Sequence, residues 1–403
     1  MAYAAMRSIA LALVALAACG DNQQGTPDAA AGPDAHFGFT EAAHPSPPVV
    51  SAGAPGTVLT TPHVVPIFFA NDDAEPQIEQ FLAMFAADPV YWPATTSEYG
   101  VGAITIQPSV VSTAPPPTTD ADLQTFLSAN IGPTGAFGAL DPQAIYTVFL
   151  PEGAGLDAGG QACKAFGGYH SEIPDASGGP SIVYALLPRC HYTGDAEPLD
   201  PTTVATSHEL VEASTDPHFY TDPGYRFLDA NDQVVSRTPG GELGDMCEYL
   251  PSAGARIIGS FMVQRTWSNN SAAAGHDPCV PAPATPYAGA GPVFTTQVPF
   301  GRSNMPTNGV SVQVGTSVTL EVDLFTDGEI PVDFEVSAMD TASITGGAPQ
   351  LDFQWNQLHG NNGDKLQLMV TRTIANTSRG NEFVIWTLVG GRYVGFWWGL
   401  VTD

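Results

Sequence analysis

The sequence has few basic residues. Lysine and arginine together number 12 against 41 aspartates and glutamates, the formal net charge is -29, and Lys164 and Lys365 are its two lysines. A chain of this composition has no basic patch to meet phosphate groups. The composition therefore argues against nucleic acid as a partner.

Long hydrophobic runs are also scarce. The apolar run at residues 9–18 follows Arg7 and is too short to span a bilayer, and residues 1–18 have the form of a secretory signal peptide. The run ends in Leu16-Ala17-Ala18-Cys19, which resembles the bacterial lipobox. There the cysteine is acylated after cleavage, whereas a plain signal peptide would leave Cys19 as an odd thiol. We therefore expect an exported protein of a bacterial cell envelope, bound to the membrane through a lipid anchor at Cys19.

Cysteine is limited to five positions. With Cys19 assigned to the anchor, four cysteines remain, and an even number in an oxidising compartment predicts two disulfides with three possible connectivities. We predict the pairs Cys163–Cys190 and Cys247–Cys279, because each pair lies within one segment of the chain and closes a loop of about 30 residues.

The 403 residues, of which 43% are hydrophobic, are enough for two or three domains with real cores. Residues 19–55 mix Gly, Pro, Ala, Asp and Ser without periodicity and predict a flexible tether. Residues 281–292 are rich in Pro, Ala and Gly and predict an interdomain linker. The two folded domains are then expected at residues 56–280 and 293–403.

The first domain shows alternating strand and helix signals, which predict an α+β fold of α/β type. Thr119 and Asp122 have the spacing of a capping box. After Pro217 the chain is rich in turns, and residues 229–232 are read as a hairpin tip rather than a calcium loop. The predicted strands are 64–70, 103–107, 144–150, 182–187 and the closing strand 257–267, with a helix at 76–87 and another after Thr119.

The second domain shows period-two alternation, which indicates half-buried strands. Residues 382–389 and 392–401 are joined by Gly390-Gly391, a two-residue hairpin signal. Roughly eight short strands in about 110 residues predict an all-β, Ig-like sandwich. Its four tryptophans are expected in the core rather than on a sugar-binding face: Trp355, Trp386, Trp397 and Trp398.

The strongest chemical signal is a predicted helix at residues 201–215. Asp200-Pro201 offers an N-cap and a proline in the first turn, and residues 202–215 contain neither glycine nor proline. His208 and Glu212 are four residues apart on this helix and can reach one metal ion.

Glu209 would stand beside this pair as the catalytic base that holds and deprotonates a water molecule. The pattern is that of a zincin helix with Glu212 in place of the usual second histidine, and a carboxylate is a known though less common zinc ligand. The alternative is a solvated helix face on which Glu209 and Glu212 are ordinary surface acids.

Two residues compete to be the third ligand of one zinc ion. His218 follows His208 by ten residues, as in metzincin-like sites, but Thr215 stands where that motif has glycine. Glu242 and Asp245 would share a helical face, as a ligand and its supporting carboxylate do in gluzincin-like sites. We favour Glu242 over His218. His170 and His191 receive no role, because histidines near cysteines and turns are more often structural.

The order of these segments resembles the phosphate-induced (exordium-like) extracellular proteins of plants and their bacterial relatives. The resemblance covers about residues 60–280 and implies secretion and a zincin-related fold. It rests on the strand at 64–70, residues 163–170 with their Gly-Gly-Tyr-His ending, Ser-His-Glu-Leu-Val-Glu at 207–212, Gly-Glu-Leu-Gly-Asp-Met-Cys-Glu at 241–248 and the closing strand that ends in Trp267.

Two functions from different classes follow. The first is a zinc-dependent metallopeptidase at the cell envelope, in which the metal polarises a scissile carbonyl of a protein or peptide, with a polysaccharide as another conceivable substrate. The second is a non-catalytic surface binding or adhesion protein that keeps a zincin-like fold.

Overall fold

The computed structural model describes residues 39–47, 49–52, 57–227, 241–300, 305–330, 332–344, 346–375 and 380–403. The expected signal peptide, Cys19 and the turn at 229–232 lie outside these residues. Within the described ranges, no helix combines the length and the apolar character needed to cross a membrane.

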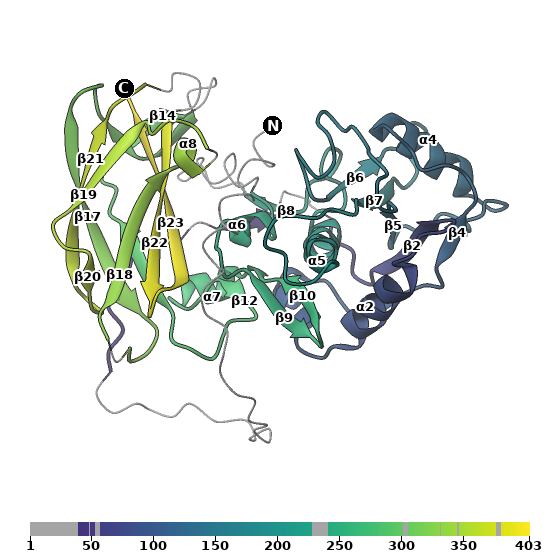
Figure 1. Ribbon diagram of the computed structural model, residues 1–403, viewed down its shortest axis with the longest axis horizontal. Coiled ribbons are helices and arrows are strands. Elements are labelled where there is room, and N and C mark those ends of the chain that lie inside the picture. Colours follow the sequence, from purple (N-terminus) through teal and green to yellow (C-terminus); the bar gives the residue numbers. More distant parts are fainter. Residues whose placement is uncertain are drawn as a thin grey trace.

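A mixed sheet forms the centre of the first part of the chain (Figure 1). Its central strands are parallel, and β6 at one edge is antiparallel to β7. The strand order is β3 (Thr105–Ile106), β2 (His63–Phe69), β5 (Ala144–Phe149), β7 (Ile182–Leu187) and β6 (Tyr169–Ile173), while β4 (Val110–Ser112) also pairs with β2.

Helices cover both faces of this sheet because alternate residues of the central strands point to opposite sides. Ile145 and Phe149 of β5 belong to the core beneath α2 (Glu75–Ala87) and α5 (Asp200–Thr215). Tyr146 and Val148 pack on the other face against α4 (Asp120–Asn130). The Thr119 side chain caps α4 by accepting a hydrogen bond from the backbone N–H of Asp122, as its spacing predicted.

Short elements complete the first part, namely α3 (Tyr91–Thr96), η2 (Ser97–Tyr99), α6 (Asp245–Glu248), β9 (Gly254–Ile258), β10 (Phe261–Gln264), β11 (Thr266–Trp267), α7 (Asn269–Ala273) and β12 (Cys279–Val280). The closing strand predicted at 257–267 is wrong as one element. The chain turns at Gly259, whose φ is 58°, so that β9 and β10 form a hairpin before β11.

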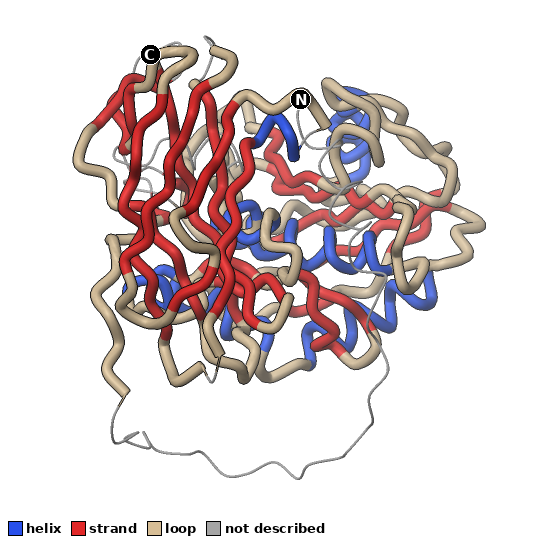
Figure 2. The backbone as a smooth tube through the Cα atoms, turned by 60° about the vertical axis from the view of Figure 1, so that its left-hand side comes forward, coloured by secondary structure: helices blue, strands red, loops and turns tan. Residues whose placement is uncertain are grey.

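The second part is a β-sandwich, and its long strands stand side by side in Figure 2. The described chain as a whole is richer in strand than in helix. One sheet has the strand order β13 (Ala288–Pro292), β17 (Ser317–Thr326), β21 (Lys365–Arg372), β19 (Leu351–Trp355). The other sheet has the order β16 (Val310–Ser311), β23 (Arg392–Thr402), β22 (Asn381–Val389), β18 (Phe334–Asp340), β20 (His359–Gly360). The pair β14 (Gln297–Phe300) and β15 (Met305–Asn308) and the helix α8 (Thr341–Ile344) complete this part.

The predicted linker at 281–292 is wrong in its second half, because residues 288–292 form β13 and pair with β17. The glycines that suggest a linker are sites of close approach. A Cβ on Gly289 would collide with the ring of Phe325, and one on Gly291 would lie 2.9 Å from Pro45. The sandwich therefore begins at residue 288.

The predicted tether at 19–55 also extends too far. The backbone N–H of Ala42 donates a hydrogen bond to Asn362, and the ring of His44 stacks on Phe325 with centroids 4.6 Å apart. Further on, β1 (Val50–Ala52) pairs with β8 (Tyr225–Phe227). Residues 39–52 therefore run along both parts of the fold, apart from residue 48, which lies outside the described residues.

The two parts share a hydrophobic core. Trp386 and Trp398 of the sandwich are buried in the same cluster as residues of the first part. The ring of Tyr249 meets Trp398 edge to face with centroids 5.0 Å apart, and Ser252 donates a hydrogen bond to the backbone carbonyl of Tyr393. Of the four tryptophans predicted to lie in the core, Trp386 and Trp398 are confirmed, whereas Trp355 and Trp397 are half-buried.

Candidate metal centre

The helix α5 carries the residues with chemical potential, and it is buried along nearly its whole length. Glu209 is 5% exposed and Glu212 is 3% exposed, so the alternative of a solvated helix face is wrong. The helix begins at Asp200 rather than after it, and the Asp200 carboxylate forms an ion pair with Arg256 at 2.6 Å. Burial of two acids on a packed helix requires positive partners.

His208 and Glu212 lie on one face of α5, as their spacing predicted. Nε2 of His208 is 3.0 Å from Oε2 of Glu212. The other oxygen of this carboxylate, Oε1, accepts hydrogen bonds from the backbone N–H groups of Gly244 and Asp245, each at 3.0 Å. These two bonds fix the carboxylate so that Oε2 stays directed toward the imidazole.

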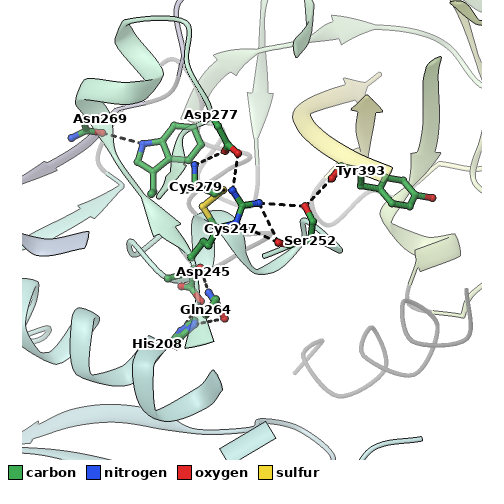
Figure 3. Close-up of a disulfide and its surroundings, with 12 residues drawn as sticks. His208, Asp245, Cys247, Ser252, Gln264, Asn269, Asp277, Cys279 and Tyr393 are labelled. Carbon is green, nitrogen blue, oxygen red and sulfur yellow. Dashed lines mark hydrogen bonds and ion pairs between the residues drawn. A yellow bond between two sulfur atoms is a disulfide. The ribbon is translucent and has the colours of Figure 1, made fainter. Parts of the chain in front are cut away.

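Gln264 at the end of β10 orients His208 (Figure 3). Its side-chain Nε2 donates to the carbonyl oxygen of Gly244 at 2.6 Å, which leaves Oε1 to accept from Nδ1–H of His208 at 3.1 Å. A proton on Nδ1 makes Nε2 the lone-pair nitrogen, which is the form that binds a metal. The backbone N–H of Gln264 also donates to Ser207.

Asp245 lies closer to this pair than the sequence indicated. Its Oδ1 is 3.7 Å from Nε2 of His208, and His208, Glu212 and Asp245 form one group with potential ligand atoms within 4.8 Å of one another. Asp245 begins α6 and Glu242 precedes that helix, so the predicted shared helical face is not formed. Asp245 therefore takes the place beside His208 that we expected for Glu242.

His170 receives no role from the sequence, but the structure places it in the cluster. It lies on the edge strand β6, with Nδ1 3.4 Å from Glu209 Oε2 and 3.7 Å from Glu212 Oε2. On the other side of the ring, Nε2 lies 3.3 Å from Glu242 Oε1. His170, Glu212 and Glu242 form a second group of potential ligands.

The pair of glycines before Tyr169 is the sequence signal that could have pointed to His170. A Cβ on Gly168 would lie 3.0 Å from Oε1 of Glu209, so glycine at this position lets the strand approach the helix closely. Gly244 has the same role on the opposite side, where a Cβ would lie 2.7 Å from Nδ1 of His208 and 2.9 Å from Glu212 Oε1.

His218 does not join either group. Its Nδ1 lies 3.3 Å from Oε2 of Glu172, and the other oxygen of this carboxylate, Oε1, accepts hydrogen bonds from the backbone N–H groups of residues 220 and 221. The proline after α5 does turn the chain, but toward Glu172 rather than toward His208. A metzincin-like ligand set with His218 is therefore not assembled. His191 is half exposed and pairs with Glu152 at 3.4 Å.

The electrostatics of the cluster favour positive charge. Burial by itself lowers the pKa of His208, but the negative charges of Glu212 and Glu209 outweigh it and raise that pKa well above its usual value. The pKa of His170 is also raised, because Glu242 and Glu209 outweigh the effect of burial. Burial and the charge of Glu212 raise the pKa of Asp245 well above its ordinary value.

The residues present fit a divalent cation. Oε1 of Glu242 is buried without a hydrogen bond, which is costly for a carboxylate unless a cation or proton meets it. Imidazole nitrogens with carboxylate oxygens are donors suited to zinc and neighbouring first-row ions.

Both predicted disulfides are confirmed, as Cys163–Cys190 and Cys247–Cys279. The second ties α6, which carries Asp245, to β12 (Figure 3). Arg265 supports this junction through an ion pair with Asp277 at 2.6 Å and a hydrogen bond to the carbonyl of Cys279. Two disulfides are typical of proteins that fold in an oxidising compartment outside the cytosol.

Comparisons with known proteins identify no family for this chain. A scan against protein-family models and a search of curated proteins find no match. Among solved structures, the chain is similar to the S-layer protein SbsC, domains 4 and 5, with 17% identity and a TM-score of 0.17. The similarity covers 28% of this chain and 54% of that one.

Proposed function

We propose that this chain is an exported metal-dependent hydrolase, with a peptidase activity as the expected reaction. The observation that carries the proposal is the buried pair of His208 and Glu212, with Nε2 and Oε2 3.0 Å apart and Asp245 beside them. An imidazole between two buried acids is costly unless the ring is protonated or a metal ion meets the carboxylates.

In this proposal His208, Glu212 and Asp245 hold one zinc ion. When bound, the ion polarises a scissile carbonyl and makes a nearby water more acidic. Glu209 accepts the proton of that water and delivers it to the leaving amine. His170 lies 3.4 Å from Glu209 and restrains its carboxylate. The contact is stronger when the Glu209 carboxylate is ionised.

We further propose a zincin-like relationship for the first part and lipid anchoring at Cys19. The first is supported by the resemblance of residues 60–280 and by a buried helix that carries His-Glu-Leu-Val-Glu next to the antiparallel edge strand β6. The second is supported by the sequence Leu16-Ala17-Ala18-Cys19.

Metal analysis of the purified full chain tests the proposal directly. We expect bound zinc that a chelator removes, together with hydrolysis of a mixed peptide library that stops on chelation and returns with added zinc. His208→Ala should lose both properties, whereas His191→Ala, which changes a half-exposed histidine outside the cluster, should keep both. Wild-type protein that binds no divalent metal would overturn the proposal.

A non-catalytic surface protein is the second candidate, and the low exposure of the cluster favours it. Structural zinc sites are closed, while catalytic sites keep an open ligand position. In that case the metal is bound but no library peptide is cleaved, and chelation lowers the melting temperature instead of stopping a reaction.

A further inference from the structure

The two groups of potential ligands share one residue, Glu212. The first group contains His208 and Asp245, and the second contains His170 and Glu242. Each group therefore has one imidazole and two carboxylates, counting Glu212 in both. A common ligand between two otherwise separate sets is compatible with two metal ions about 3.5–4 Å apart.

Both imidazoles face the same atom, Oε2 of Glu212. Nε2 of His208 lies 3.0 Å from it and Nδ1 of His170 lies 3.7 Å from it. Nδ1–H of His208 donates to Gln264, and Nε2 of His170 lies 3.3 Å from both the backbone carbonyl of Asp216 and Oε1 of Glu242. Gln264 thus holds His208 in the tautomer whose Nε2 can bind a cation, and His170 has a potential ligand of the second group at each ring nitrogen, Glu212 at Nδ1 and Glu242 at Nε2.

In the second group, one buried carboxylate oxygen has no hydrogen bond. Oε1 of Glu242 is buried without a hydrogen bond, and its charged neighbour in the structure is Nε2 of His170 at 3.3 Å. The His170 side chain is 4% exposed. His170 and Glu242 do not belong to the first group. One ion among His208, Glu212 and Asp245 therefore leaves Glu242 without a metal ion.

The charge of the cluster leads to the same result. When ionised, Glu209, Glu212, Glu242 and Asp245 together carry four negative charges, which one divalent ion and one protonated histidine do not balance and two divalent ions do. Within the described residues, the ion pairs of these three glutamates are with His170 and His208. Buried charge in excess of its partners is strongly destabilising.

We propose that the cluster binds two divalent first-row metal ions that share Glu212 as a ligand. One ion lies among His208, Glu212 and Asp245, and the other lies among His170, Glu212 and Glu242. The inference builds on the proposed function but goes beyond it, because a mononuclear hydrolase needs the first ion alone.

The number of metal ions per chain tests this inference. After zinc loading and removal of free metal, elemental analysis of the full chain should give two ions for the wild type. His170→Gln and Glu242→Gln should each retain only the ion among His208, Glu212 and Asp245. His208→Gln should lose that ion and retain the ion among His170, Glu212 and Glu242. Loading with Mn²⁺ should give an exchange-coupled electron paramagnetic resonance signal in the wild type and an isolated-ion signal in His170→Gln.

The controls separate the possible failures. Circular dichroism must show that each variant is folded, and His276→Gln, a half-exposed histidine paired with Asp327, should keep two ions. One ion in the wild type, or no change in stoichiometry in His170→Gln, would overturn the two-ion inference and leave the proposed function intact. No bound ion in the wild type would overturn both.

Discussion

Nδ1 of His170 on β6 lies 3.4 Å from Oε2 of Glu209 on α5. Both side chains are buried, and the contact joins the edge of the central sheet to the helix that carries His208 and Glu212. Glu209 belongs to neither group of potential metal ligands, although its carboxylate contacts His170 of the second group. This position suits a base that contacts the attacking water without binding the metal.

Glu209→Gln should therefore separate metal binding from catalysis. Glutamine keeps the size of the side chain but cannot accept a proton, so we expect full metal content and a loss of peptide hydrolysis of about 10²–10⁴-fold. Metal analysis and a library hydrolysis assay on the same preparation measure the two effects. Retained hydrolysis would remove Glu209 from the mechanism, and lost metal would make it a ligand.

Gly244→Ala tests how closely the loop before α6 packs on the cluster. The added Cβ would lie 2.7 Å from Nδ1 of His208 and 2.9 Å from Oε1 of Glu212, while φ of −70° at Gly244 suits any residue. We expect a loss of about 1–3 kcal/mol in unfolding free energy and weaker zinc binding. Gly155→Ala is the matched control, since nothing lies within 4 Å of its Cβ. Equal behaviour of both variants would contradict the packing argument.

Cys19→Ser tests the anchor. The wild-type protein expressed in a bacterium should partition with membranes, because acylation of Cys19 supplies the binding energy, whereas the variant should be recovered in the soluble exported fraction. Fractionation followed by immunoblotting measures this. The same distribution for both proteins would rule out lipidation at this residue.

The residues that local signals specify were predictable. The absence of glycine and proline over 202–215 and the Asp-Pro start indicate α5, and the separation of four residues places His208 beside Glu212. The sandwich hairpin at Gly390-Gly391 follows from two glycines, which have φ of 55° and 78°. In each case the information lies within one short segment of the chain.

The rest of the cluster depends on contacts between distant segments. His170 meets Glu209 across 39 residues because the edge strand β6 packs beside α5, and no periodicity in residues 169–173 indicates this. Asp245 replaces Glu242 beside His208 because α6 is a single turn that begins at Asp245. Likewise, β13 looks like a linker because its glycines accommodate Phe325 and Pro45 from elsewhere.

The pair of His63 and Asp141 predicts a pH dependence of stability. Burial by itself raises the pKa of Asp141, but hydrogen bonds from Nδ1 of His63 at 2.6 Å and from the backbone N–H of Gln143 outweigh it, and the pKa is lowered. A lowered pKa means that the folded state favours the ionised form. The stabilisation is therefore present above the ordinary aspartate pKa of about 4 and is lost as the pH falls through the lower folded value.

Asp141→Asn should remove this part of the acid sensitivity. Because the pair is partly exposed, we expect a difference below about 1 kcal/mol at pH 6 that vanishes near pH 2. Urea unfolding between these pH values measures it. His63→Gln should give a similar loss, and the double variant should lose little more, since both changes break one contact. Identical pH profiles for wild type and Asp141→Asn would contradict the assignment.

The disulfide Cys247–Cys279 should support the metal centre as well as the fold. Replacing both cysteines by alanine opens a loop with a sequence separation of 32 and should cost about 3–4 kcal/mol of unfolding free energy. It should also weaken zinc binding, because α6 carries Asp245 and the backbone N–H groups that orient Glu212.

Removing Cys163–Cys190, with a separation of 27, is the control. It should destabilise the fold to a similar extent but leave zinc affinity nearly unchanged, because β6 remains paired with β7. Calorimetric titration with zinc at a temperature where both variants are folded compares them, and equal zinc affinities would show that α6 holds its position without the cross-link.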